Sequence, residues 1–480
     1  MYAGIDLGAS ALKITLCDRA GRVRAESRVR LQTLHPAPDQ AEQRPGDWLR
    51  ALRRAFAVLD ARNLSGLAVS AGTHSFVLLD ARGRPLGNAL LWSDQRAASV
   101  AACLEKESGQ AIIDTGKNRI QATWTLAMLA WMREHRPQLL RQTARLCFAK
   151  DYLREWLSDA TGPLTDPGDA TGSLLADPVK QEWSEALCRL AGITQRQLPG
   201  IAQSDSPAGK LSRKAARALG LSPGLPIYTG CIDTSAELLP AGLLREDDCQ
   251  LKLASAGVFS RIIDQAAFHP AASLYPTLNG GWYHASGVNN CAGAINWGTR
   301  ALWNRNAPLL LDAAIGRVLA RGVEIDLPLF HPYLLGERAP LWRADLRASF
   351  SGIHAAHGRD ELAWAIGEGV LHALAHARDA CELSQPGQAI AVTGGLTNLP
   401  NFMRLAAALL NQTLTTLAHS DASYGAALLA ARAGDALQWS EIKAIATRNR
   451  VASHQPDAAL VELLAQRYRN YRSQLPQPMH

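Results

Sequence analysis

The sequence predicts an α/β protein with at least two domains. Its 480 residues exceed what one ordinary domain needs, so the chain can bury large cores. Strands are followed closely by helices, as at 225–242, where the apolar run Leu225–Tyr228 leads through a turn at Gly230 into a helix from Asp233. The strand–turn–strand pattern of the N-terminus returns in residues 250–263. This short repetition indicates a duplicated architecture.

The composition is that of a soluble globular protein, with 47% hydrophobic and 19% charged residues. The net charge is +7, but the basic residues are scattered, so nucleic acid is not an expected partner. Eight cysteines occur without a Cys-x-x-Cys pair, which favours reduced thiols over zinc or disulfides. The sequence shows no signal-peptide pattern and no apolar run long enough to cross a membrane. We therefore expect a cytoplasmic protein without a membrane partner.

Asp233 is the first candidate for chemistry. A carboxylate at a strand-to-helix corner points out of the sheet edge, where open α/β folds bind their ligands. It could accept a proton from a substrate hydroxyl as a general base. The alternative is an N-cap, because Asp is favoured before the first turn of a helix. Judged on this stretch alone, the cap is the better interpretation, although Thr234 or Ser235 could also serve as one.

The N-terminal hairpin carries the motif Asp6-x-Gly8-x-Ser10-x-x-Lys13 at its first turn. Gly8 and Ser10 can offer backbone N–H groups and a hydroxyl to phosphate oxygens. Asp6 could hold a metal-bound water. An ordinary hairpin with a polar turn explains the same residues, so this signal is weak by itself.

Several other polar residues follow predicted strands. His74 and Asp94 lie at strand ends, where they could bind a hydroxylated ligand, and either Asp166 or Asp169 could reach a substrate from a polar loop. For His74 or Asp94 taken alone, ordinary loop polarity is the better interpretation. In the compact loop at 331–340, we expect Glu337 and Arg338 to form a structural ion pair.

The C-terminal half predicts a long helix at 360–381, in which Gly367 and Gly369 would allow close packing. A strand at 389–392 ends in Gly394-Gly395, and a helix follows from Pro400. A strand, a Gly-Gly loop and a helix N-terminus together can bind an anion. On the final predicted helix, at 458–475, we expect a solvated basic face formed by Arg467, Arg469 and Arg472.

Taken in order, these stretches resemble the FGGY family of carbohydrate kinases, which belong to the actin/ribonuclease H-like superfamily. The resemblance runs from Met1 to about Ala431. The segments that carry it are the Asp6…Lys13 opening, Gly72-Thr73-His74 with Leu91–Arg96, Thr165–Gly172, Asp233, Pro332–Pro340 and Gly394-Gly395. The string Pro-Tyr-Leu-Leu-Gly-Glu-Arg-Ala-Pro at 332–340 is the most specific of them. Within the family, the segments are most similar to those of xylulokinases.

The resemblance implies two actin/ribonuclease H-like α/β domains, at 1–243 and 244–480, with a cleft between them. It implies phosphorylation of the terminal hydroxyl of a ketose, D-xylulose first, with ATP and Mg²⁺ as cofactors. It makes Asp233 the catalytic base and places Thr73, His74 and Thr234 on the sugar. The implied nucleotide-binding residues are Gly8, Ser10, Lys13, Ser255, Gly257, Gly394, Gly395 and Asn398, with Asp6 at the metal.

The chain departs from the family pattern at Thr73, where xylulokinases usually have Met, and at Thr234, where Asn or Gln is usual. Ala254 also replaces the usual Gly of the second phosphate turn. Three alternatives therefore stay open: a kinase for another ketose or polyol such as ribulose or rhamnulose, a sugar-binding pseudokinase, and an actin-like ATPase. The protein could also form a homodimer.

Overall fold

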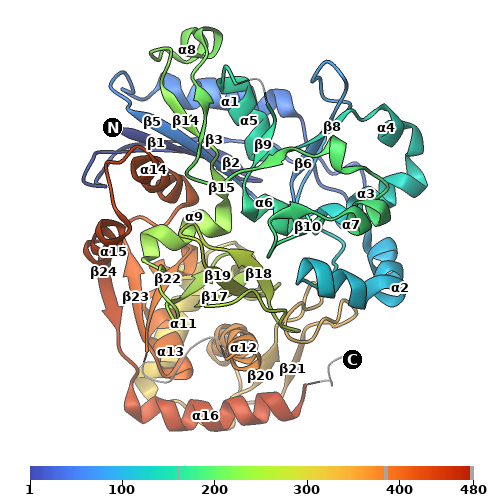
Figure 1. Ribbon diagram of the computed structural model, residues 1–480. Coiled ribbons are helices and arrows are strands. Elements are labelled where there is room, and N and C mark those ends of the chain that lie inside the picture. Colours follow the sequence, from blue (N-terminus) through green and yellow to red (C-terminus); the bar gives the residue numbers. More distant parts are fainter. Residues whose placement is uncertain (161, 383–387, 476–480) are drawn as a thin grey trace.

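The computed structural model describes residues 1–160, 162–382 and 388–475. Two mixed sheets of seven strands each form the centres of two α/β domains (Figure 1). The helices α9 (Asp233–Ala241) and α14 (Ala422–Ala433) lie between the two sheets. This arrangement confirms the predicted fold of two actin-like domains.

The N-terminal sheet has its apolar strands in the middle. Its order is β13 (Pro207–Lys210), β14 (Pro226–Tyr228), β5 (Gly66–Ala71), β1 (Tyr2–Leu7), β2 (Ala11–Cys17) and β3 (Val23–Arg30), and β15 (Cys231–Ile232) also pairs with β5. Strands β1 and β5 are buried along their whole length, whereas the edge strand β3 alternates between half-buried and exposed residues. The helices α1 (Pro45–Ala57), α5 (Ala149–Leu157) and α8 (Arg213–Leu219) accompany this sheet.

A smaller layer extends the N-terminal domain. Its sheet has the order β4 (Glu42–Gln43), β7 (Ala89–Leu90), β6 (Phe76–Leu79) and β8 (Arg145–Phe148). The helices of this region are α2 (Ala98–Gly116), α3 (Thr125–His135), α4 (Pro137–Gln142), α6 (Pro167–Gly172) and α7 (Glu185–Ala191). The two-stranded pairs are β9 (Leu164–Thr165) with β12 (Gly200–Ile201), and β10 (Ala176–Asp177) with β11 (Glu182–Trp183).

The C-terminal sheet has the order β18 (Ser273–Pro276), β19 (Trp282–Val288), β17 (Gly257–Ile263), β16 (Cys249–Leu253), β22 (Ala389–Thr393), β23 (Thr413–Leu417) and β24 (Arg450–His454). Its helices are α10 (Ala292–Trp303), α11 (Pro308–Arg321), α12 (Arg359–Ala380), α13 (Pro400–Leu410), α15 (Trp439–Arg448) and α16 (Ala458–Ser473). The strands β20 (Leu329–His331) and β21 (Ser349–Ser351) form a separate two-stranded antiparallel sheet.

The two large sheets repeat the same pairing. Strand β1 pairs antiparallel with β2 and parallel with β5, and β16 pairs antiparallel with β17 and parallel with β22. Each sheet continues with one more parallel strand, β14 beside β5 and β23 beside β22, before the helix α9 or α14. The duplication predicted from two short hairpins is therefore present across both domains.

The helix α14 belongs to the second half of the chain but packs on β1, β5 and α9 of the first half. Two glycines allow this close approach. A Cβ at Gly425 would lie 1.9 Å from the carbonyl oxygen of Ala236, and a Cβ at Gly4 would lie 2.0 Å from that of Ser423. The two domains are thus joined by direct backbone contact as well as by the chain connection after α9. The division at residues 243 and 244 remains a prediction.

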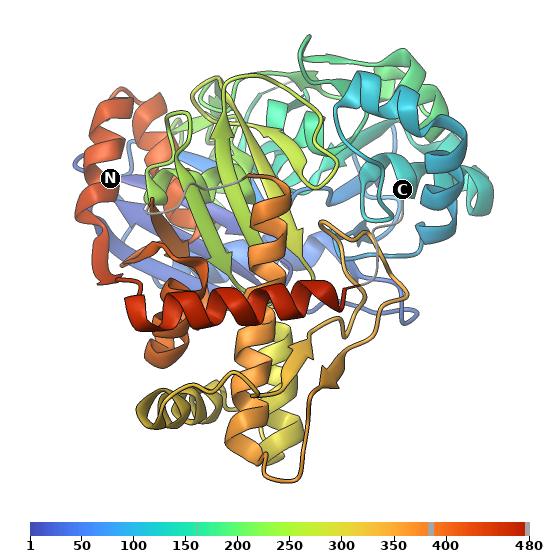
Figure 2. The same cartoon turned by 90° about the horizontal axis from the view of Figure 1, so that it is seen from below.

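The long C-terminal helix is confirmed as α12, and its glycines pack closely as predicted. A Cβ at Gly369 would lie 2.1 Å from the carbonyl oxygen of Phe330, and one at Gly367 would lie 2.7 Å from the side chain of Ile315. The helix α16 lies across α12 near the C-terminus (Figure 2).

The prediction of a solvated arginine face on α16 is wrong for Arg467. Its side chain is buried and forms two hydrogen bonds to Glu368 of α12, at 2.7 and 2.6 Å. Its remaining donors bind the carbonyl oxygens of Ile325, Leu327 and Pro328. Arg469 and Arg472 are exposed, as expected. The packing of α16 on α12 decides the difference, because it covers only one side of the helix.

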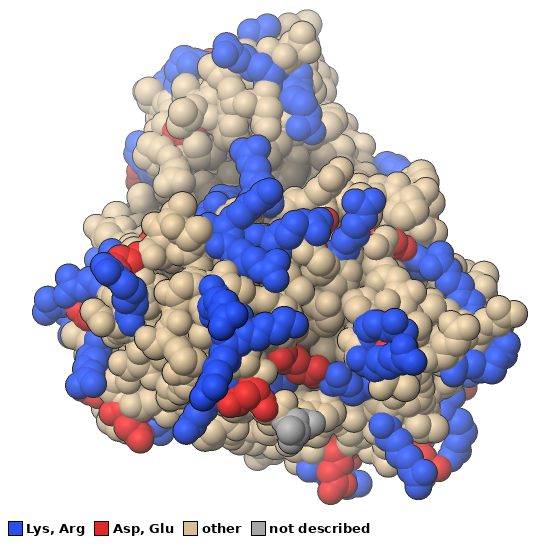
Figure 3. Space-filling model, turned by 90° about the horizontal axis from the view of Figure 1, so that it is seen from above, with Lys and Arg blue, Asp and Glu red and all other residues tan. Residues whose placement is uncertain are grey.

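The surface agrees with the composition. In Figure 3, Lys and Arg side chains are found over much of the face shown, and several of them lie side by side near its centre. All eight cysteines are free thiols, and seven of them are buried. Within the described ranges, no helix combines the length and the apolar character that a membrane crossing requires.

Candidate active site

A cavity of about 310 Å³ lies between the two domains. The N-terminal domain contributes Thr73, His74, Trp92, Trp124, Asp233, Thr234 and Glu237, and the C-terminal domain contributes Lys252, Ala254–Ala256, Tyr275, Arg338 and Trp342, among others. Five residues predicted from the sequence therefore meet in one space: Thr73, His74, Asp233, Thr234 and Ser255.

Asp233 is the first residue of α9, and Ile232 occupies the N-cap position. Its Oδ1 accepts a hydrogen bond from the Thr234 amide at 2.8 Å and longer contacts from the amide and hydroxyl of Thr73, at 3.4 and 3.3 Å. Its Oδ2 forms no hydrogen bond with any residue that the structure describes. One oxygen thus fixes the carboxylate, and the other is free to face a ligand.

Three more ionisable groups surround Asp233. Lys252 of β16 pairs with Glu237 of α9 at 2.6 Å, and Asp6 accepts a hydrogen bond from Ser70 at 2.9 Å. Burial, together with the neighbouring Asp233 carboxylate, raises the pKa of Asp6 to about 7. Burial alone would lower the pKa of Lys252, but Glu237, Asp233 and Asp6 outweigh it and hold that pKa above its ordinary value. Around Asp233, the site therefore combines one cation, Lys252, with several acidic side chains.

His74 is held rigidly in the neutral form. Burial lowers the pKa of its imidazole to about 4, and the charge of Arg338 also lowers it. Its Nδ1 lies 2.6 Å from the carbonyl oxygen of Gly172, so Nδ1 carries the proton and donates it. Its Nε2 can then accept from the Tyr275 hydroxyl at 3.3 Å. The φ of His74 is +70°, an unusual backbone conformation of the kind that often occurs at functional sites.

Thr234 lines the cavity, but its hydroxyl already has a partner. Its Oγ1 lies 2.8 Å from the hydroxyl of Tyr283, which also contacts Ser235 at 3.2 Å. A ligand hydroxyl could join this network, because a hydroxyl both donates and accepts.

The two predicted phosphate turns both contain backbone amides that are free to donate to a ligand. After β1, the amides of Ala9 and Ser10 have no acceptor among the described residues, and after β16 the same holds for Ser255 and Ala256. Two successive free amides form a concave site for an anion. Ala254 has no positive φ, so this turn does not need the glycine that is usual in the family.

The other predicted nucleotide residues lie outside the lining of the cavity. Gly8 is at the first turn, where its amide donates to Ala11, and Gly257 packs against Leu374. Lys13 forms an ion pair with Asp421 at 2.7 Å, just before α14.

The Gly-Gly loop follows β22, beside the end of β16. Gly394 has a φ of +97°, and a Cβ there would lie 2.3 Å from the carbonyl oxygen of Leu253, so only glycine fits. A side chain at Gly395 would meet nothing within 4 Å. Asn398 donates to the carbonyl oxygen of Gly395 at 3.3 Å and closes the loop. The loop therefore packs on the second phosphate turn and leaves open space beside it.

Asp6 is compatible with a divalent cation. Its Oδ2 has no hydrogen bond among the described residues, and its pKa is raised by burial and then by the negative charge of Asp233, which a cation would offset. Within the described ranges, no group of three or more His, Cys, Asp or Glu could bind a metal alone. Mg²⁺ commonly uses one or two carboxylates together with phosphate oxygens and water.

Three acidic residues considered as ligand contacts are structural instead. Asp94 is fully buried, where it accepts from Arg96 and from the Ala41 amide. Asp166 and Asp169 surround the buried Lys150, at 3.0 and 3.1 Å. They anchor α6, whose Gly172 positions His74.

The predicted ion pair between Glu337 and Arg338 does not form. The Oε1 of Glu337 accepts instead from two backbone amides, those of Asn289 and Arg338, at 2.7 and 2.8 Å. The guanidinium of Arg338 extends into the cavity lining. Neighbours in sequence could not predict this separation, because the loop turns the two side chains apart.

The sequence analysis missed several residues of the cavity. Glu237 is four residues after Asp233 on α9, and this spacing places both on one helix face. Gln250 and Lys252 alternate with the buried Leu251 and Leu253 on β16, so period-two alternation could have identified Lys252. No pattern in the neighbouring sequence predicts Tyr275 or Trp342 as cavity residues, because the fold of the C-terminal domain places them there.

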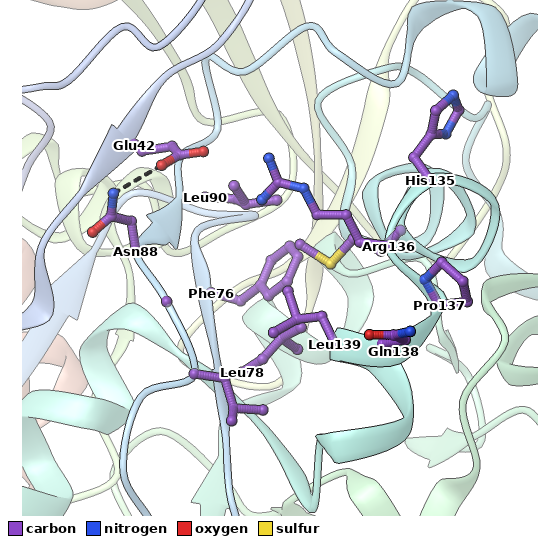
Figure 4. A pocket seen from close by; sticks show the side chains of 13 residues that line it. Glu42, Phe76, Leu78, Asn88, Leu90, His135, Arg136, Pro137, Gln138 and Leu139 are labelled. Atoms are coloured by element: carbon purple, nitrogen blue, oxygen red, sulfur yellow. Dashed lines mark hydrogen bonds between the residues drawn. The ribbon is translucent and has the colours of Figure 1, made fainter.

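A second cavity, of about 580 Å³, lies between the small sheet and the helices α3 and α4 (Figure 4). Its apolar lining includes Phe76, Leu78 and Leu139, and Asn88 donates to Glu42 at its edge, at 2.9 Å. It contains none of the predicted site residues.

Comparison with known protein families identifies the class. Residues 1–240 match the N-terminal domain of the FGGY family of carbohydrate kinases, and residues 261–434 match its C-terminal domain. The chain belongs to this family and is an ATP-dependent sugar kinase.

Individual relatives narrow the comparison. The chain is 29% identical to the xylulose kinase of Escherichia coli K12 over 471 residues, which cover 95% of each chain. It superimposes on a xylulose kinase structure from Rhodospirillum rubrum with a TM-score of 0.88, at 26% identity over 98% of this chain and 97% of the other. A gluconokinase of Bacillus subtilis is 24% identical over 385 residues, covering 77% of this chain and 75% of that protein.

Proposed function

We propose that the protein transfers the γ-phosphoryl group of ATP to the terminal hydroxyl of a ketose, with D-xylulose as the first candidate and D-xylulose 5-phosphate as its product. The observation that carries the proposal is the free Oδ2 of Asp233 in a cavity that Lys252 and the amide turn at Ser255–Ala256 also line. The similarity to xylulose kinases along nearly the whole chain supports the choice of sugar.

In the proposed reaction, Asp233 accepts the proton of the sugar hydroxyl while that oxygen attacks the γ-phosphorus. Such phosphoryl transfer depends mainly on positioning and on stabilising charge. Thr73 fixes Oδ1 of the carboxylate, so that Oδ2 keeps one orientation. Thr73, His74 and Thr234 would contact the sugar, where the neutral His74 could bind a hydroxyl without attracting phosphate.

The nucleotide would lie on the C-terminal side of the cavity. The free amides at Ala9–Ser10 and Ser255–Ala256, together with Lys252, would neutralise phosphate charge. Gly8, Lys13 and Gly257 shape or flank these turns, and the loop at Gly394, Gly395 and Asn398 would hold the adenosine. Mg²⁺ arriving with ATP would offset phosphate charge near Asp6. Closure of the domains would exclude water, which otherwise competes as the acceptor.

A coupled ADP-release assay tests the proposal. Purified protein with Mg·ATP would be given D-xylulose, D-ribulose, L-rhamnulose, glycerol and gluconate in separate reactions. We expect ADP release that depends on sugar and is fastest with D-xylulose. Equal ADP release without sugar would instead indicate an ATPase, and thermal stabilisation by sugar without ADP release would indicate a pseudokinase.

Gluconate is included because the gluconokinase relative covers most of the chain. A fastest rate with gluconate would reject the ketose assignment and retain the kinase.

A further inference from the structure

Arg338 is a cation without a protein partner at the edge of the sugar cavity. In the part of the chain that the structure describes, its guanidinium forms no ion pair and no hydrogen bond, and its Nε is buried. The group packs against the backbone of Gly287, where a Cβ would lie 2.9 Å from one terminal nitrogen. A buried donor without an acceptor is costly, so the unpartnered Nε favours a ligand that supplies oxygen atoms.

Arg338 and Lys252 both line the cavity, but they have different neighbours. The guanidinium of Arg338 packs against Gly287, whereas Lys252 pairs with Glu237 at 2.6 Å. Glu337, which would be the nearest counter-ion in sequence, uses one oxygen for the amides of Asn289 and Arg338. Of these two cations, only Lys252 is paired with a carboxylate among the described residues, so Arg338 is the one left available to a ligand.

The geometry of the guanidinium donors indicates which chemical group of a ligand Arg338 could bind. A guanidinium offers only donors, arranged in a planar fork that suits two acceptor oxygens side by side. A 2-ketose that is phosphorylated at its far terminus has a carbonyl oxygen at C2 and a hydroxyl oxygen at C1. The carbonyl only accepts, so it matches the fork better than the C2 hydroxyl of a polyol, whose own hydrogen must find another partner.

We propose that Arg338 determines specificity by binding the hydroxyketone end of the sugar, remote from the hydroxyl that Asp233 deprotonates. This inference rests on the proposed kinase function and adds a reason for ketose selectivity. A sugar acid presents a similar pair of oxygens, so the test includes one.

The experiment compares kcat/KM for D-xylulose, for its C2-reduced polyols xylitol and D-arabinitol, and for D-xylonate, in the wild type and in Arg338→Gln, Arg338→Met and Arg338→Lys. We expect the wild type to prefer the ketose. Loss of a charged hydrogen bond should raise the KM for D-xylulose about 10- to 100-fold in the Gln and Met variants. The KM values for the polyols should change less than about threefold, so the preference for the ketose should disappear in the Gln and Met variants. Arg338→Lys should restore part of that preference.

Arg343→Met is the matched control, because Arg343 is in the same loop but pairs with the exposed Asp345. It should keep the ketose preference. The ratio of the two substrates is measured in one preparation, so partial misfolding of a variant would not alter it. An unchanged ketose-to-polyol ratio in Arg338→Gln, or a wild-type preference for D-xylonate that this variant loses, would overturn the inference. Absence of sugar-dependent ADP release in the wild type would instead reject the proposed function itself.

Discussion

Two regions of the molecule place one lysine among three carboxylates, and they behave differently. In the N-terminal domain, Lys150 contacts Asp151, Asp166 and Asp169 at 2.7, 3.0 and 3.1 Å, and it is completely buried. In the cavity, Lys252 contacts only Glu237 directly, while Asp233 and Asp6 act on it from further away.

The difference lies in which atoms remain free. In the first cluster, the Lys150 ammonium group is paired with carboxylates of the protein itself. Asp166 also caps α6 through the amides of Gly168 and Asp169. The cavity cluster leaves Oδ2 of Asp233 open to a ligand. The same residue types therefore build a structural anchor in one place and a candidate reaction centre in the other. Composition alone does not separate the two.

The largest effect should come from Asp233→Asn. The variant keeps the size of the side chain but removes the base, so kcat should fall by about 10²- to 10⁴-fold. Asp47→Asn is the control, because Asp47 is also in the first turn of a helix, α1, but lies outside the cavity. Activity is measured by ADP release and stability by urea unfolding. Near wild-type turnover in Asp233→Asn would remove Asp233 from the mechanism.

The second prediction concerns the buried cluster. Lys150→Met leaves Asp166 and Asp169 without their cation and Asp151 with Arg154 alone, and removal of one partner from a buried ion pair costs about 3–5 kcal/mol. We expect this loss in the free energy of unfolding. Lys180→Met, at an exposed pair with Asp177, should cost less than about 1 kcal/mol. Equal stability of the two variants would contradict the structural role of Lys150.

Lys252→Met should affect activity more than stability, which is the reverse of what we expect for Lys150→Met. Its partner Glu237 borders the cavity, where water can replace part of the lost contact, so stability should fall less than in Lys150→Met. Loss of a group that stabilises transferring charge should reduce kcat about 10²-fold. A variant that loses stability but retains its specific activity would place Lys252 with the structural lysine.

The smallest effect concerns Glu337, a buried carboxylate with no cation bonded to it. Burial raises its pKa to about 7 from the ordinary value of 4.5, against the opposing effect of the amides that it accepts from. The folded protein thus binds this proton more tightly than the unfolded chain. Between about pH 4.5 and 7 the folded state holds more protons, so the free energy of unfolding should decrease as pH rises through that window.

Glu337→Gln should remove this decrease, because Gln does not titrate and can still accept from the two amides. Urea unfolding at pH 5, 6, 7 and 8 compares the variant with the wild type. Parallel pH profiles for the two proteins would show that the carboxyl does not titrate in this range.

Much of the fold could be predicted because its signals are local. The apolar runs of β1, β2 and β16, the periodicity of α1 and α12, and the glycines before α9 and α13 each act within a few residues. The strand-to-helix corner also placed Asp233 correctly at the start of α9. The packing of Gly367 and Gly369 was predictable for the same reason, because glycine in a helix has a local cost that close packing explains.

The partners of charged side chains could not be predicted in this way. Arg467 is separated from Glu368 by 99 residues, and only the crossing of α16 over α12 brings them together. Arg338 and Glu337 are neighbours in sequence, yet their side chains have different surroundings. Asp166 looked equivalent to other loop acids until the structure placed it against Lys150.

The sequence by itself determined the strands, the helices, the duplicated plan and the residue types available for phosphoryl transfer, since hydrophobic periodicity and turn chemistry act over short distances. Only the tertiary structure decided which charges are satisfied internally and which face the space between the domains. The reason is that electrostatic pairing depends on distance and burial, and both are set by contacts between segments far apart in the chain.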